Sequence, residues 1–247
     1  MSFNFKYQLW FFSIIAITFF SCGKDSACFK GTGKIVEEQR VISSDVTMIR
    51  TQNNIDIVIT QSNEASLTIE GGENLLPYIN TDVSGTEITI SSDNKCSMFR
   101  DYSIPITAYL SLPNITKINY TGQGNITSTN TLNLTSLDIE SSGGTGSINL
   151  NLNVNDFSVG QHSGPADFTF TGSVKNARVY TLGSGWFYLQ DFISEKLEVN
   201  HSGIGDVILN VTDRLDIGLQ SHGNINYYGN PTVIIYTHTG SGQIIKK

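Results

Sequence analysis

A five-residue phrase recurs seven times between Gly122 and Ile244, and it constrains the fold more than any other feature of the chain. In most copies it reads as a small residue, any residue, Gly, a small polar or other residue, and an apolar residue. Its central residues stand at positions 124, 146, 166, 185, 205, 223 and 242, so the average step is about 20 residues. A fixed period of this length is typical of a solenoid, in which neighbouring turns stack because one turn cannot bury its own apolar face.

Apolar and polar residues alternate after each phrase. Between Ile148 and Val154, for example, apolar residues alternate with asparagines, and similar runs start at Phe168, Phe187 and Val207. Alternation of period two predicts strands with one buried face, which in stacked turns lie about 4.8 Å apart. We therefore predict an all-β, single-chain parallel β-helix or β-solenoid with about 20 residues per turn, wound right-handed as parallel crossovers generally are.

The glycine in the middle of the phrase predicts a tight corner at the same place in every turn. Such a corner requires either a positive φ or a backbone without a side chain. The predicted corner glycines are Gly124, Gly146, Gly185, Gly205, Gly223 and Gly242. An antiparallel sandwich or barrel, with turn signals every 8–12 residues, is the alternative fold.

Residues 39–120 alternate in the same way but lack the phrase, as between Ile55 and Ile59 and between Ile88 and Ile90. We predict N-terminal β turns here that form one continuous domain with the repeats of 121–247. The segment 73–78 is the one place where a helical turn is expected. Residues 22–38 are expected to form a tether.

The first 21 residues have the features of an export signal. One cation, Lys6, precedes an apolar run from Leu9 to Phe20, which is too short to span a bilayer but suits a secretory signal peptide. The run ends before Cys22 in a sequence that resembles a bacterial lipobox and predicts lipidation of Cys22; an ordinary signal with an incidental cysteine is the alternative. The following Gly23-Lys24-Asp25 resembles the export signal of surface lipoproteins in Bacteroidetes.

The remaining cysteines and the overall charge narrow the range of partners. Cys28 and Cys96 are the two cysteines left, and an exported compartment permits a disulfide between them, although two unrelated thiols fit the sequence equally well. The formal charge is −7, and no cluster of Lys or Arg is present. Such a surface offers the phosphate backbone nothing to bind, so nucleic-acid binding is not expected.

Several segments together resemble one family. They are Gly31–Glu38, Ile55–Gln61, Glu73–Pro77 and the ending Gly223–Pro231, followed by Gly240-Ser241-Gly242. The chain is similar here to the putative auto-transporter adhesin, head GIN domain family, which is common in Bacteroidetes lipoproteins. The resemblance implies a β-helix similar in architecture to pectin lyases and a role in adhesion, with no established catalytic residues. Ala166, Ser221 and Trp186 depart from the repeated phrase.

Two groups of polar residues recur at equivalent places in the turns, one of histidines and one of aspartates, and each suggests a kind of site. His162, His201 and His238 stand four residues before the phrase centre, and we expect a surface row; at about 10 Å between every second turn, they are too far apart to share a metal ion. Asp167 and Asp206 are also two turns apart, at or beyond the upper limit for an inverting glycosidase pair. Neither a catalytic residue, a metal nor a cofactor is therefore predicted, and a polysaccharide-processing enzyme is the alternative.

Aromatic residues supply the candidate binding surface. Trp186, Tyr188 and Tyr228 are expected to face outward, where they could stack on sugar rings or anchor a protein. Aromatic ladders that only stabilise the stack are an equal alternative. The expected protein is an exported outer-membrane lipoprotein, held by its lipid, that binds a glycan or a cell-surface protein. A scaffold without a ligand is the other alternative, the periplasmic or external side is open, and the oligomeric state is unknown.

Overall fold

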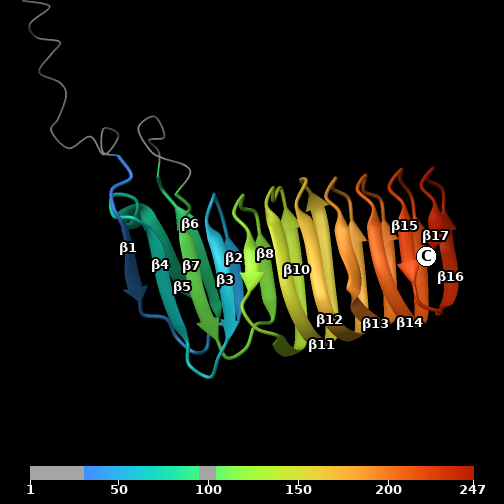
Figure 1. Ribbon diagram of the computed structural model, residues 1–247, viewed down its shortest axis with the longest axis horizontal. Helices are drawn as coiled ribbons and strands as arrows, with labels where there is room; N and C mark the ends of the chain where they lie inside the picture. The colour runs from blue at the N-terminus through green and yellow to red at the C-terminus, as the bar shows by residue number, and fades with distance from the viewer. Residues whose placement is uncertain (1–30, 95–103) are drawn as a thin grey trace, which may run out of the picture.

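The computed structural model describes residues 31–94 and 104–247, and the strands in these ranges form a single 17-stranded sheet. The sheet winds into an elongated solenoid of about six turns with about 20 residues each (Figure 1). This confirms the predicted β-solenoid, and the sandwich or barrel is wrong. The strands are β1 (Ile35–Arg40), β2 (Met48–Thr51), β3 (Asp56–Gln61), β4 (Ser66–Gly72), β5 (Ile79–Ser84), β6 (Glu87–Ser92), β7 (Thr107–Leu112), β8 (Lys117–Tyr120), β9 (Ile126–Ser128), β10 (Leu132–Ser142), β11 (Ser147–Ser163), β12 (Asp167–Thr181), β13 (Phe187–His201), β14 (Val207–Leu219), β15 (Ile225–Tyr228), β16 (Thr232–His238) and β17 (Ile244–Lys246).

From β8 onward, every strand pair is parallel, and equivalent residues of successive turns lie side by side. Ile148 pairs with Phe168, Phe168 with Phe187 and Phe187 with Val207. All four side chains are fully buried, whereas the asparagines between Ile148 and Val154 are exposed. The alternation in the sequence therefore separates core from surface in these turns as predicted.

The core lies between the two halves of each turn. The first half of a long strand follows the glycine corner, and the second half leads into the next corner. Phe157, in the second half of β11, lies 5.1 Å between ring centroids from Phe170 and 5.3 Å from Phe192, both in edge-on geometry. Phe170 and Phe192 belong to first halves, so the two halves face each other and their outward residues form opposite surfaces.

The central glycines of the phrase lie at the corners because the turns approach too closely there for a side chain. A Cβ at Gly185 would lie 1.7 Å from the carbonyl oxygen of Ala166, and one at Gly205 would lie 2.2 Å from that of Gly185. Neither glycine has a positive φ. Of the two reasons considered for these glycines, close backbone approach is therefore the one that applies.

The N-terminal region departs from simple stacking. β2 and β3 pair in parallel with β8 and β9 on one side, so that Ile57 lies beside Ile126, and with β6 and β7 on the other. However, β1 pairs with β4, β4 with β7, and β5 with β6 in antiparallel orientation. These antiparallel strands close the N-terminal end of the solenoid (Figure 1).

Two local features of this region bear on the sequence expectations. Leu76–Tyr78 forms a 3₁₀-helix, which agrees with the helical turn expected in 73–78. β1 begins at Ile35, so the last part of the expected 22–38 tether is instead a strand. The reason is the long antiparallel partner β4, with which β1 aligns from Ile35 to Arg40.

Candidate functional site

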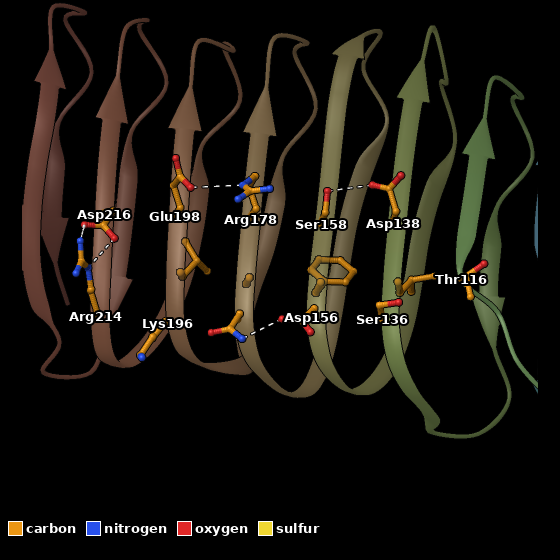
Figure 2. A pocket seen from close by; sticks show the side chains of 15 residues that line it. Thr116, Ser136, Asp138, Asp156, Ser158, Arg178, Lys196, Glu198, Arg214 and Asp216 are labelled. Atoms are coloured by element: carbon orange, nitrogen blue, oxygen red, sulfur yellow. Dashed lines mark hydrogen bonds and ion pairs between the residues drawn. The ribbon is translucent and has the colours of Figure 1, made fainter.

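A groove of about 520 Å³ runs along the solenoid axis on the surface formed by the second halves of the turns (Figure 2). It exists because residues two apart on a strand both point outward, and equivalent residues of successive turns form rows. One wall consists of Ser136, Asp156, Asn176, Lys196 and Arg214; the other consists of Asp138, Ser158, Arg178, Glu198 and Asp216. Five turns thus form the two walls, whose four spacings of about 4.8 Å give a length of about 19 Å, and Thr116 adds to the lining just before β8.

The floor between the walls is formed by neighbouring strands at a row of buried apolar residues. Leu137, Phe157, Ala177 and Leu197 line the groove and are nearly buried. In this row Ala177 pairs with Phe157 on one side and with Leu197 on the other. All four residues are held in hydrogen-bonded strands, so the floor is rigid and formed before any ligand arrives.

The charges of the walls are arranged unevenly. At the N-terminal end Lys117 binds Asp138 at 2.7 Å, and this hydrogen bond raises the pKa of Lys117. At the C-terminal end Arg214 makes two hydrogen bonds to Asp216, at 2.8 and 3.0 Å, which raise its pKa. In each of these two pairs the positive and the negative side chain neutralise each other.

The middle of the groove is more open to a ligand. Arg178 makes a single long contact of 3.4 Å with Glu198, and 71% of its side chain is exposed. Lys196 is exposed, and no carboxylate in the described part of the chain forms an ion pair with it. The sequence could not show this groove, because its walls arise only from the register between turns.

The predicted aromatic surface lies on the opposite face. The rings of Trp186 and Tyr188 stack at 5.9 Å with an interplanar angle of 15°, and Trp186 is 40% exposed. Tyr228 is 41% exposed but pairs with Asn210, in a different row and two turns further on. The structure thus brings Trp186 and Tyr188 together and leaves Tyr228 apart.

Asp167 and Asp206 have a structural use at the corners. Asp167 accepts a hydrogen bond of 2.8 Å from the backbone N–H of Trp186, and Asp206 accepts one of the same length from that of Asn224. Asn224 in turn accepts from the backbone of Gln243. We call this row the corner ladder: a polar side chain in one turn satisfies a backbone donor in the next, which explains the small polar residue of the phrase.

A column of polar side chains is buried beneath the corners. It contains Thr51, Tyr120, Ser141, Gln161, Thr181 and His201, which are paired in register from turn to turn. The Tyr120 hydroxyl donates to the Gly124 carbonyl at 2.7 Å, and the Gln161 amide donates to the Ala166 carbonyl at 2.8 Å. This buried polar column supplies donors to corner carbonyls that have no strand partner.

The expected surface row of histidines is wrong. His201 is 1% exposed, contacts Thr181 through Nδ1, and has its pKa lowered by burial. His162 lies one position outside the column because the register of β10 and β11 shifts at Ser141, and it contacts Glu140. Only His238 shares the row of His201, through Leu219. Counting from the phrase missed this one-residue irregularity.

Some predicted residues lie outside the part of the chain that the structure describes. These are Cys22, Cys28 and Cys96. Within the described ranges, no group of three or more His, Cys, Asp or Glu is placed to hold a metal ion. In the same ranges, no helix has both the length and the apolar character to cross a membrane.

Solved structures share this architecture. A putative adhesin from Bacteroides fragilis aligns with a TM-score of 0.82 at 22% identity, covering 88% of this chain and 100% of its own. A putative adhesin from Parabacteroides distasonis aligns at 0.64 and 19% identity, covering 87% and 98%. From the same organism, a putative lipid binding protein aligns at 0.63 and 21%, covering 88% and 100%. At these identities the likeness shows the fold.

No curated protein sequence matches the chain. The family described as putative auto-transporter adhesin, head GIN domain, matches residues 45–231. This range extends from the strands of the N-terminal region through the glycine corners to the Tyr-Gly-Asn-Pro ending at Pro231. The chain therefore belongs to the putative auto-transporter adhesin, head GIN domain family.

Proposed function

We propose that the protein is a binding module of the cell envelope, an adhesin that contacts a glycan or a surface protein through Trp186 and Tyr188. The carrying observation is the stacked, outward-facing pair itself, at 5.9 Å between ring centroids with Trp186 40% exposed. An exposed aromatic pair offers a large apolar contact area at little cost in side-chain entropy. Because strands on either side hold both residues, the surface is already formed before binding.

The proposed module performs no reaction. The carboxylates considered for glycoside hydrolysis, Asp167 and Asp206, bind backbone N–H groups of the corner ladder. A general acid must instead reach the reacting oxygen of a substrate. The family and the similar structures from Bacteroides fragilis and Parabacteroides distasonis are described as putative adhesins, which supports a protein that binds and does not catalyse a reaction.

The envelope location rests on the sequence. In this proposal Cys22 carries the lipid that attaches the protein to the outer membrane, residues 23–34 connect it to β1, and the solenoid faces the exterior. A pair of anchoring chains holds a protein stably, whereas one chain is marginal. A disulfide between Cys28 and Cys96 would tie the start of the mature chain to the N-terminal region.

Binding is tested by screening the purified protein on a glycan array and on intact bacterial and host cells. Trp186→Ala should lower binding about tenfold or more, and Tyr188→Ala should act in the same direction. Tyr228→Ala, an equally exposed aromatic outside the pair, serves as the matched control and should leave binding unchanged. Equal losses in all three variants would contradict a site at the stacked pair.

Location is tested separately by protease treatment of intact cells, beside a Cys22→Ala variant. Digestion of the anchored protein on intact cells supports the adhesin. Protection until the outer membrane is opened would sink it and leave a periplasmic scaffold. Release of the Cys22→Ala variant into a soluble fraction would support the lipid anchor, and unchanged membrane attachment would overturn it.

A further inference from the structure

We propose that the groove of Figure 2 is a second binding site, for an extended glycan chain that carries carboxylate or sulfate groups on some of its sugars. This site lies on the face opposite Trp186 and stands whether or not the aromatic pair binds anything. The two walls carry charges and hydroxyl groups that are unevenly distributed along the groove.

The strongest observation is a pair of like charges. Lys196 and Arg214 are direct partners on neighbouring parallel strands, and both are exposed. Like charges in this position repel each other and destabilise the pairing. Arg214 is compensated by Asp216 on its own strand, whereas Lys196 has no carboxylate within ion-pair distance in residues 31–94 and 104–247. An anion seated on Lys196 would remove this repulsion.

Arg178 is placed to complete the anion site. It lies one turn before Lys196, in the opposite wall of the groove. A guanidinium has five N–H donors, and a single long bond to Glu198 occupies one of them. A carboxylate or sulfate between Arg178 and Lys196 would therefore receive charge-assisted hydrogen bonds from both walls.

The other end of the groove is suited to hydroxyl groups. Ser136, Ser158, Asp156 and Asn176 line it, and Asp156 accepts a hydrogen bond of 2.9 Å from Asn176. The serine hydroxyls and the Asn176 amide can donate and accept, and the Asp156 carboxylate accepts, as recognition of sugar hydroxyls requires. The Asp156 carboxylate, whose partner is the neutral amide of Asn176, would repel a densely charged polymer such as a nucleic acid. The favoured ligand is therefore a sugar chain with spaced charges.

The shape of the groove agrees with this ligand. It is shallow, extends over about 19 Å from four strand spacings of about 4.8 Å, and has a rigid apolar floor. An extended chain can lie along it and place several sugars in contact with successive turns. A compact ligand would use only a small part of the walls.

Binding is tested by isothermal titration at low ionic strength with four probes: dextran carboxymethylated on a minority of its sugars, dextran sulfated to the same low degree, unmodified dextran and polyglutamate. The carboxymethylated or the sulfated dextran should bind, and comparison of the two distinguishes carboxylate from sulfate. Lys196→Gln and Arg178→Gln should each lower that affinity about tenfold. Added salt should weaken binding of the unaltered protein more than that of either variant.

Lys175→Gln is the matched control. Lys175 is an exposed lysine one turn earlier, outside the groove, and its replacement removes the same charge. Equal losses for Lys175→Gln and Lys196→Gln would reduce the effect to net charge and overturn the site. Binding of dextran alone, preferential binding of polyglutamate, or no binding to any probe would also overturn it. Trp186→Ala should leave these affinities unchanged, which separates this site from the aromatic one.

Discussion

The two ends of the solenoid solve the same stacking problem differently. In the turns from β8 onward, equivalent residues lie in register, backbones approach closely at glycine corners, and polar rows bridge one turn to the next. In the N-terminal region, antiparallel partners β1, β4 and β5 cover the outermost turn, and the hairpin between β5 and β6 turns at Gly85. The comparison teaches that the repeated phrase is a requirement of turn-on-turn contact, which hairpins do not share.

Replacing one glycine in each region tests that distinction and has the largest expected effect. Gly185→Ala places a Cβ 1.7 Å from the Ala166 carbonyl, so we expect a loss of more than about 3 kcal/mol in the free energy of unfolding. Gly85 has a φ of 59° and no atom near its missing Cβ. Gly85→Ala should cost about 1 kcal/mol, from backbone strain alone.

Urea denaturation followed by circular dichroism measures both variants. Gly85→Asn is the control for the hairpin, because asparagine tolerates a positive φ and should be nearly neutral. Equal losses at Gly185 and Gly85 would show that both glycines serve the same purpose, and the distinction between the regions would fail.

The corner ladder gives a smaller contrast. Asp206→Ala removes the acceptor for the backbone N–H of Asn224, at 2.8 Å, and for its side-chain amide, at 3.1 Å. We expect a loss of about 1.5 kcal/mol in unfolding free energy. Asp82→Ala, at an exposed position of the N-terminal hairpin, should change it by less than about 0.5 kcal/mol. A neutral Asp206→Ala would remove the proposed reason for the polar residue in the phrase.

The smallest expected effect concerns pH. Burial lowers the pKa of His201, so below its unfolded value of about 6.5 the unfolded chain takes up a proton that the folded chain refuses. Stability from this residue is therefore present above about pH 6.5 and is lost as the pH falls towards the folded pKa. Urea midpoints at about pH 7.5 and 5.5 should differ less in His201→Leu, which copies Leu219 of the next turn.

The exposed His222 supplies the control for this pH experiment. His222→Gln should retain the pH dependence of the unaltered protein, because His222 is exposed and lies outside the buried polar column. If His222→Gln and His201→Leu reduced the dependence alike, the buried polar column would have no special part in it.

The sequence predicted the repeated part of the fold well. The phrase marks the corners where turns approach closely, and the alternation that begins at residues such as Ile148 marks the side chains that stack inside successive turns. It did not separate β4 and β5 from stacked turns, because a hairpin and a parallel turn have the same alternation of period two. His201 was placed on the surface because it was grouped with His162 by its position in the phrase, whereas its own strand alternates inward at Leu197, Val199 and His201. Trp186 and Tyr188 were foreseen as outward, but the groove depends on register across five turns.

The in-register stacking of the turns also determines how such a molecule can change in length. Each long strand contacts mainly its two neighbours, so a segment of one period could be inserted or deleted between two corners while the cross-section stays constant. Each added period would extend the groove by about 4.8 Å and supply one more residue to each wall. The number of periods thus sets the length of glycan that the groove can hold. Relatives with more or fewer periods would bind longer or shorter glycan segments.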